Sequence, residues 1–270
     1  LVVTIMVLKS TEGNEPMNTR KALLSSLLIA PVAAFAAGAT AKAPSPDHFF
    51  AGVNVGAAHN SAELSALYDS TLNREAHFEN TAASSGMLAG IDLGYDMSLG
   101  GGKNIAFTFG INANTAALKQ SMSLHDKATH SGEAFDLIQS FEPKMQYNLM
   151  LSYGYAVTPS FSSHVNVGAS FMVVDHTLQI HDTGQTDADD LAAEDVSDTN
   201  SLTGGLIGFG SSMNMGSGEI HWDMNYYMYG SQKLDDVTDV DASADATDNL
   251  SERKAVLTMP AFTVGYHFNF

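Results

Sequence analysis

The closing stretch "FTVGYHFNF", Phe262–Phe270, decides how the rest of the sequence is interpreted. Large apolar residues occupy every second position of this stretch: Phe262, Val264, Tyr266, Phe268 and Phe270. Small or polar residues stand between them. Because successive side chains of a β-strand point to opposite faces, this period of two predicts a strand with one apolar and one polar face. A soluble sheet can have the same pattern, so the other segments must decide the class of fold.

The composition limits the classes of protein that the sequence can encode. Its 270 residues are enough for one large domain or two small ones. The formal net charge of −18 argues against a nucleic-acid backbone as partner. The chain has no cysteine, which excludes a disulfide framework and a thiolate metal site.

The N-terminal region has the features of a secretory signal peptide. A basic start, Met17–Lys21, precedes an apolar run, Ala22–Phe35, and small residues follow. A transmembrane helix is the alternative. It is disfavoured because the run is shorter than the about 20 residues that a helical span needs, and because Pro31 interrupts it.

Seven further segments repeat the alternation of the closing stretch. The eight together are 48–59, 86–97, 104–114, 144–157, 164–173, 206–215, 220–230 and 262–270. Each is about as long as a tilted membrane-spanning strand, about 9–11 residues. Bulky apolar residues without charge line one face, and Gly, Asn, Ser and Thr with occasional Asp or His line the other.

The polarity of the two faces decides between the all-β folds. A lipocalin-like soluble barrel would point its bulky apolar face inward. The interior of an eight-stranded barrel is too narrow for five or six bulky residues from every strand. We therefore expect the bulky residues to face lipid and the small polar residues to face the lumen.

The connections between the segments alternate in length. Three tight turns lie at 98–103, 158–162 and 216–219, and four long polar stretches at Asn60–Ser84, Lys119–Glu142, Asp182–Thr199 and Lys233–Glu252. Short turns at one end and long loops at the other are typical of outer-membrane barrels. The sequence thus predicts an all-β fold, an eight-stranded antiparallel up-and-down transmembrane β-barrel with four long extracellular loops and short periplasmic turns.

The domain organisation follows from the signal peptide and the barrel. Residues 1–36 are expected to be an upstream extension plus a signal peptide that starts at Met17, and residues 37–270 the outer-membrane barrel domain. Cleavage is expected after Ala36 or after Ala41, where small residues follow the apolar run. The residues before Met17 are expected to reflect a misplaced start codon.

Aromatic residues predict the orientation of the barrel. If both termini lie in the periplasm, seven aromatics fall near that interface: Phe49, Tyr95, Tyr153, Tyr155, Trp222, Phe268 and Phe270. Such a girdle places amphipathic rings at headgroup level. A soluble core of aromatics is the alternative that we do not favour.

Two of these motifs resemble a known family. The opening "FFAGVNVGAA", residues 49–58, is similar to the first strand of OmpA-type and opacity-type eight-stranded barrels, and "TVGYHFNF", residues 263–270, resembles the C-terminal assembly signal of bacterial outer-membrane proteins. The resemblance implies a monomer in the bacterial outer membrane, in contact with its lipids. It also implies delivery by the secretion translocon and insertion by the barrel-assembly machinery. Pro260 departs from the pattern; without a ladder donor, it is expected to mark a bulge near the extracellular rim.

Six ionisable residues are expected to point into the lumen: Asp92, Asp96, His164, His221, Asp223 and His267. An inward His–Asp set could be catalytic, but catalysis also needs a nucleophile within reach of a base, and the sequence has no motif for one. A buried polar network is the favoured interpretation. We therefore assign no catalytic residue, no cofactor and no metal ligand from the sequence.

The long polar stretches are acidic or ambiguous. Stretches 182–198 and 233–252 each carry seven acidic residues. The segment from Asp239 resembles a calcium loop, but Ala244 stands where the turn needs Gly and Leu250 where the bidentate Glu should be, so a solvated surface loop is favoured. Residues 61–80 fit either a short amphipathic helix or extensions of the strands.

The function expected from these features is that of a surface scaffold or adhesin-like protein, not an enzyme, with its acidic loops exposed to a host or cell-surface ligand. A small cation-preferring pore is the alternative, because ten inward glycines would leave free volume beside inward carboxylates. A lipid- or peptide-modifying enzyme of the outer membrane is the second alternative.

The terminal aromatic pattern generates a prediction about assembly. Phe270→Ser should impair insertion and leave the chain in the periplasm, because the resemblance implies that the assembly machinery recognises this residue. The measurement is the amount of protein in outer-membrane fractions. A variant that reaches the outer membrane at the normal level would exclude this role.

Overall fold

The computed structural model describes residues 47–70, 74–125, 134–182, 196–233, 237–238 and 249–270. The expected signal peptide, both cleavage sites and most of the two acidic stretches lie outside these residues, as do residues 239–248 of the calcium-like loop. Within the described part of the chain, no helix is long and apolar enough to cross a membrane.

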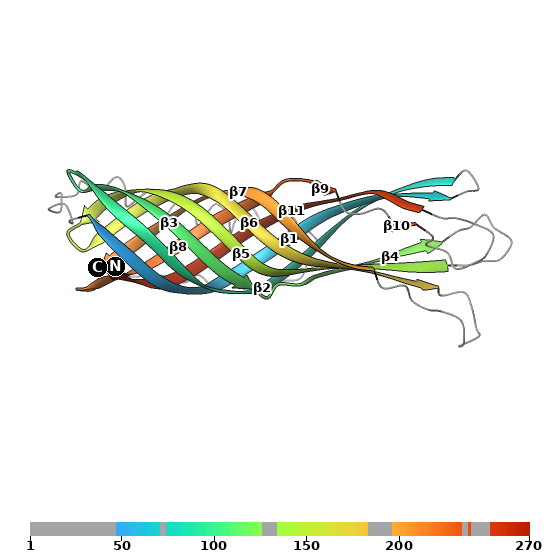
Figure 1. Ribbon diagram of the computed structural model, residues 1–270, viewed down its shortest axis with the longest axis horizontal. Coiled ribbons are helices and arrows are strands. Elements are labelled where there is room, and N and C mark those ends of the chain that lie inside the picture. The colour runs from blue at the N-terminus through green and yellow to red at the C-terminus, as the bar shows by residue number, and fades with distance from the viewer. Residues whose placement is uncertain (1–46, 71–73, 126–133, 183–195, 234–236, 239–248) are drawn as a thin grey trace, which may run out of the picture. The chain divides into compact units, whose positions relative to one another are not determined.

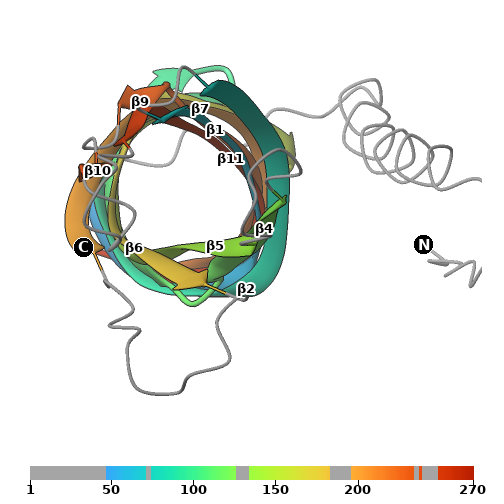
Figure 2. The ribbon, with the colours of Figure 1, turned by 90° about the vertical axis from the view of Figure 1, so that its right-hand side faces the viewer.

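Eight strands form a closed ring in which each strand pairs antiparallel with its neighbours (Figure 1). They are β1 (His48–Ser70), β2 (Arg74–Gly100), β3 (Lys103–Asn114), β5 (Ala134–Thr158), β6 (Phe161–Asp182), β7 (Val196–Asn214), β8 (Gly218–Tyr229) and β11 (Asn249–Asn269). β11 also pairs with β1 and so closes the ring, which Figure 2 shows along its axis. The prediction of an eight-stranded antiparallel barrel is confirmed.

Three further strands are short and extend the ring at one end. They are β4 (Leu118–His125), which pairs with β5, and β9 (Gln232–Lys233) and β10 (Val237–Thr238), which pair with β11. We call this end the hairpin end. The opposite end, where the three tight turns lie, is called the turn end.

The two faces of the wall are as the alternation predicts. Bulky apolar side chains point outward, and Phe49 is 66% exposed. Polar side chains such as Asn112 and Asn166 point inward, and Asn166 is fully buried. An apolar surface of this extent around a whole barrel is typical of a wall that faces lipid.

The tight turns connect neighbouring strands with few residues. β2 ends at Gly100 and β3 begins at Lys103, and the backbone φ of Gly100, Gly101 and Gly102 is 78°, 61° and 77°. Glycine adopts such positive φ angles without a steric penalty, which explains the run of three glycines.

Two of the four long polar stretches, Asn60–Ser84 and Lys119–Glu142, are mostly strand within the described residues, which corrects the expected loop boundaries. β1 continues to Ser70 and β2 begins at Arg74, so the helix considered for residues 61–80 is wrong and the strand extensions are confirmed. The strands lengthen because cross-strand hydrogen bonding continues into water, where both faces can be polar and the apolar period is no longer needed. β2 reaches 27 residues, far more than the about 9–11 that a span needs.

The bulge expected at Pro260 is absent, which corrects the sequence analysis. β11 keeps one register against β1 from Ala261 to Thr258, and its first register shift lies between Ser65 and Leu67 of β1. Proline costs one ladder donor, but an uninterrupted pairing of Pro260 with Tyr226 of β8 holds the register.

A different proline, Pro143, lies beside a bulge of β5. The extra residue there is Lys144, whose Nζ lies 2.7 Å from Glu142 Oε2 and 3.3 Å from Asp175 Oδ2. Hydrogen bonds to these two carboxylates raise the pKa of Lys144. This charged group marks where the apolar outer face ends on β5 and β6.

Aromatic side chains gather on the outer face near the turn end. The rings of Phe49 and Tyr95 are 4.7 Å apart, and Trp222 lies 5.6 Å from Phe161. Tyr266 also contacts Phe268, at 4.7 Å. These contacts place the predicted girdle at the turn end of the barrel.

Some inward glycines face side chains of neighbouring strands. A Cβ atom at Gly90 would meet the Asn112 side chain, and one at Gly94 would meet the ring of Phe50. In a barrel this narrow, these two glycines make room for the amide and the ring.

Apolar residues fill the lumen toward the hairpin end, which the sequence analysis also missed. We call this group the apolar layer: Leu88, Met172, Leu202, Leu206 and Met259, all at most 4% exposed. These residues alternate with outward-facing residues along their strands, as the inward polar residues nearer the turn end also do. Buried amides lie at the same level: Asn114 pairs with Leu88 across the strands and donates to Asn60 Oδ1, and Gln146 pairs with Met172 and donates to the Tyr229 hydroxyl.

The filled lumen predicts different outcomes for two neighbouring substitutions. Gly90→Val should destabilise the barrel by about 1–3 kcal/mol, because the added side chain meets Asn112 and the backbone of Ile111. Ala89→Val, on the outer face, should change little. Urea unfolding in detergent, followed by the fluorescence of the single tryptophan, measures both. Equal midpoints for the two variants would show that the lumen has room to spare.

Candidate functional site

The lumen near the turn end contains a cluster of ionisable side chains from four strands. All six residues expected to point inward do so. Asp92 comes from β2, His164 from β6, His221 and Asp223 from β8, and His267 from β11. We call these five residues, together with Glu219 of β8, the histidine cluster.

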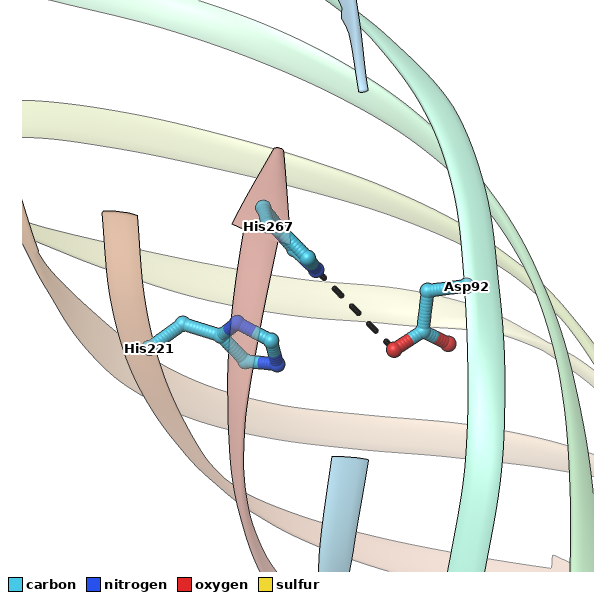
Figure 3. Close-up of side chains that lie close together, drawn as sticks. All are labelled: Asp92, His221 and His267. Carbon is cyan, nitrogen blue, oxygen red and sulfur yellow. Dashed lines mark ion pairs between the residues drawn. The ribbon is translucent and has the colours of Figure 1, made fainter. Parts of the chain in front are cut away.

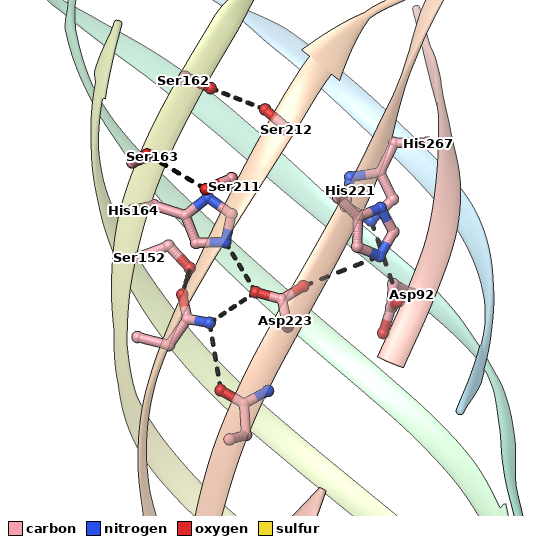
Figure 4. Close-up of polar contacts among 12 residues, drawn as sticks. Asp92, Ser152, Ser162, Ser163, His164, Ser211, Ser212, His221, Asp223 and His267 are labelled. Carbon is pink, nitrogen blue, oxygen red and sulfur yellow. Dashed lines mark hydrogen bonds and ion pairs between the residues drawn. The ribbon is translucent and has the colours of Figure 1, made fainter. Parts of the chain in front are cut away.

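Asp223 forms one half of the histidine cluster (Figure 4). Its Oδ1 accepts a hydrogen bond from Asn166 Nδ2 at 2.8 Å and lies 2.7 Å from His164 Nε2. Its Oδ2 lies 4.0 Å from His221 Nε2, too far for a hydrogen bond. One oxygen of Asp223 is therefore fully engaged, and the other faces the second half of the cluster.

His267 is the centre of that second half (Figure 3). Its Nδ1 lies 3.4 Å from Glu219 Oε1, and its Nε2 lies 3.9 Å from Asp92 Oδ2. The ring is packed between two others, with centroids 3.8 Å from that of His221 and 4.3 Å from that of Phe50. Packing on both sides fixes the direction of the two ring nitrogens.

Asp96 is the one predicted lumen residue that stands apart from the cluster. Both of its carboxylate oxygens accept hydrogen bonds from Asn104 Nδ2, at 2.9 and 2.8 Å. The structure thus brings together five of the six predicted residues and ties the sixth to β3.

Three glycines make room for the histidines. A Cβ atom at Gly52 would meet His267, one at Gly265 would meet His221, and one at Gly210 would meet both Asp223 and His164. The inward glycines therefore do more than keep the inner face of the wall free of bulky side chains. They allow each imidazole to lie close to the backbone of the neighbouring strand.

Sequence reasoning missed the partners of the cluster. Glu219 was counted within a tight turn, and Asn54 and Asn166 were counted only as inward polar residues. Asn54 Nδ2 donates to Asp92 Oδ2 at 2.6 Å. Glu219 lies two residues before His221, and residues two apart in a strand share a face, so the pattern could have predicted that Glu219 points inward. Which amide meets which carboxylate depends on the stagger of the strands, which the pattern does not contain.

A cavity of about 120 Å³ lies beside the cluster and reaches the turn end. Its walls include His164, His221, Asp223 and His267, and it extends to Lys103 next to the first tight turn. A smaller cavity of about 30 Å³ continues past Asn54 toward Tyr227. Beyond it the lumen is filled by the apolar layer.

The described histidines of the cluster do not form the hydroxyl–imidazole pair of a serine-type nucleophile. In the described part of the lumen, none of His164, His221 and His267 hydrogen-bonds a hydroxyl group. The Ser–His pair that the structure does contain, His59 Nδ1 to Ser85 Oγ at 2.9 Å, is exposed on the outer face. Nucleophilic catalysis needs a hydroxyl within reach of its base, so the lumen arrangement suits binding better than acyl transfer.

Among known proteins, the chain is similar to solved structures of low sequence identity. No protein-family model and no curated protein matches the chain. Among solved structures, the outer membrane protein OprG from Pseudomonas aeruginosa is 11% identical, with 85% of this chain and 98% of that chain covered and a TM-score of 0.39. Ail, the attachment invasion locus protein of Yersinia pestis, is 12% identical, with 82% and 98% covered and a TM-score of 0.32. The outer membrane protease OmpT from Escherichia coli is 10% identical, with 84% and 98% covered and a TM-score of 0.32. Likenesses at this level leave substrate and partner open.

The engagement of Asp223 predicts a graded response to substitution. Asp223→Ala should lower the free energy of unfolding by about 1–3 kcal/mol, because buried donors of His164 and Asn166 lose their acceptor. Asp223→Asn keeps one carbonyl oxygen in place and should recover most of that loss. Glu63→Ala, at an exposed position of β1, is the control and should leave the unfolding midpoint unchanged. The same midpoint for Asp223→Ala and the control would mean that the network does not stabilise the barrel.

Proposed function

We propose that this outer-membrane β-barrel is a surface protein, a scaffold or adhesin-like module whose long hairpins present an acidic face outside the cell. The observation that carries the proposal is the lumen, which is filled by the apolar layer and topped by strands that continue beyond it. A protein of this design offers a surface and not a passage.

The length of the strands supports a role outside the membrane. β1, β2, β5, β6 and β11 have 21 to 27 residues, about twice what a tilted span uses. Beyond the ring they continue as two groups, because β2–β3 pairing ends at Leu88 and β7–β8 pairing at Gly204. One group is β2–β1–β11 and the other β4–β5–β6–β7.

The charge of the hairpin end favours a basic partner. The stretches 182–198 and 233–252 carry seven acidic residues each, and the chain as a whole has a formal charge of −18. Complementary potentials raise the rate of association and select partners of opposite charge. We therefore propose a cationic host or cell-surface ligand, in addition to the membrane lipids and to the secretion and assembly machineries during biogenesis.

The two alternatives are less well supported by the geometry. A cation-preferring pore needs a continuous wet path, whereas the side chains at the level of the apolar layer are buried against one another. An enzyme of lipids or peptides needs a nucleophile beside a base, and the described lumen histidines contact no hydroxyl group. The proposal therefore includes neither conductance nor catalysis.

Single-cysteine variants test the orientation, because the chain has no cysteine of its own. Ser197→Cys lies at the hairpin end of β7, and Ser160→Cys lies in the turn between β5 and β6; both positions are exposed. A membrane-impermeant maleimide added to intact cells should label Ser197→Cys and should reach Ser160→Cys only after the cells are opened. The reverse labelling would invert the barrel and end the surface proposal.

Charge neutralisation tests the surface role itself. Asp187, Asp189, Asp190, Glu194 and Asp195 can be changed together to the matching amides, which conserves side-chain size. Cells with this variant should adhere less than wild-type cells to surfaces coated with a basic protein, at equal surface levels. Unchanged adhesion would refute the acidic face as the binding surface.

A steady conductance of the refolded wild-type barrel in planar bilayers would favour the pore instead.

A further inference from the structure

We propose that the histidine cluster is a binding site for a divalent transition-metal ion, with His221, His267 and Asp92 as ligands and Asp223 beside them. This assignment goes beyond the surface role and does not depend on it. One ligand atom from each of Asp92, His221 and His267 lies within 4.8 Å of the other two. The three side chains converge from different strands in Figure 3.

The spacing is close to that of a coordinated set. Zinc bonds of about 2.0–2.2 Å to nitrogen and oxygen place tetrahedral ligands about 3.4 Å apart. His267 Nε2 and Asp92 Oδ2 are 3.9 Å apart, and His221 Nε2 and Asp223 Oδ2 are 4.0 Å apart. Small side-chain rotations bring these atoms into coordination distance without moving the strands.

Unsatisfied ring nitrogens point to a missing electrophile. His267 Nε2 is buried without a hydrogen-bond partner. His221 is only 4% exposed, and its Nε2 lies 4.0 Å from Asp223 Oδ2, which is beyond hydrogen-bond distance. Buried polar atoms are nearly always paired, so these two Nε2 atoms call for a bound group.

The contact with Glu219 explains what kind of group fits. A carboxylate accepts only, so His267 donates its Nδ1 proton to Glu219, and the neutral ring then has a lone pair on Nε2. That lone pair faces the Asp92 carboxylate, which is also an acceptor. A cation between the two atoms satisfies both, and a carboxylate–histidine–metal arrangement is the usual way in which proteins orient such a ligand.

The other ligands are oriented in the same manner. Asn54 holds Asp92 through a hydrogen bond of 2.6 Å. His164 and Asn166 hold Oδ1 of Asp223, which leaves Oδ2 turned toward His221. Each carboxylate of the site therefore has an outer partner that limits its rotation, as second-shell groups of metal sites do.

The donor set indicates the class of metal. Imidazole suits Zn²⁺, Cu²⁺, Ni²⁺ and Fe²⁺, whereas Mg²⁺ and Ca²⁺ prefer oxygen ligands only. The cavity of about 120 Å³ gives the ion a path from the turn end and room for water ligands. The apolar layer blocks the opposite path, so the site exchanges metal on one side of the membrane only.

The position of the site gives binding a structural consequence. Asp92 belongs to β2, His267 to β11 and His221 to β8, and β1 pairs between β2 and β11. A bound ion would therefore join strands on both sides of the contact between the first and last strands. An ion that binds only the folded barrel stabilises it by mass action.

Metal analysis of the refolded full chain tests the proposal. The protein is folded in detergent, stripped with EDTA, and equilibrated with micromolar Zn²⁺ in the presence of excess Mg²⁺, which occupies weak acidic sites at the surface. We expect one tightly bound Zn²⁺ per chain and a higher thermal midpoint than in EDTA. Co²⁺ in the same site should give the visible absorption of a nitrogen–oxygen tetrahedral complex. No zinc retained against Mg²⁺, with no change in midpoint, would overturn the site.

Variants locate the ion. His267→Gln and Asp92→Asn each remove one ligand with little change in size and should abolish the bound Zn²⁺, whereas His59→Gln, on the outer face, should retain it. Glu219→Gln should weaken binding by about 10–100-fold, because the amide can donate to Nδ1 and so favours a proton on Nε2. Heat-modifiable migration on gels verifies folding, and Asp92→Asn serves if the histidine variant does not fold. Zinc that persists in both ligand variants would place it elsewhere and refute the assignment.

Discussion

Closure of the hydrogen-bond ladder between β1 and β11 is the constraint on which the rest of the structure depends. In hydrocarbon, an unpaired backbone N–H or C=O group costs several kcal/mol, so a sheet that crosses the membrane has to leave no edge. The pairing between β1 and β11 runs from Phe50 opposite Asn269 to Asp69 opposite Asn249. Eight strands closed in this way enclose a narrow lumen. Every inward position must then be filled by groups that satisfy one another.

The lumen meets this requirement in two different ways along its length. Toward the turn end, amides, histidines and carboxylates pair with each other around a small cavity. Toward the hairpin end, the apolar layer packs beside buried amides such as Asn114, which contacts Met259 and Asn60. In the proposed surface role, this packed barrel is the support for the long hairpins. The same closure gives the histidine cluster access from one end alone, so the surface role and the metal site make use of opposite ends.

The metal site and the closing ladder are coupled through their strands. Histidine rings at the site lie over glycines of adjoining strands, so the ligands can form only when the register around the closing contact is correct. Hydrogen bonds from or to three neighbouring residues then orient the side chains of the site: Glu219, Asn54 and Asn166. A metal bound there reports on correct closure and reinforces it, while the outer hairpins remain free to vary in sequence.

Local alternation in the sequence is enough to predict the number of ring strands, the two faces and the inward direction of five ionisable residues: Asp92, His164, His221, Asp223 and His267. Neighbouring side chains of a strand face opposite sides, so no knowledge of the strand order is needed for these predictions. The contact of His164 with Asp223, 59 positions away, and that of Glu219 with His267 are visible only in the folded barrel. Such meetings depend on the stagger of strands around the ring. The apolar layer was missed for a related reason: an inward leucine such as Leu206 looks, in an alternating pattern, like one more lipid-facing residue.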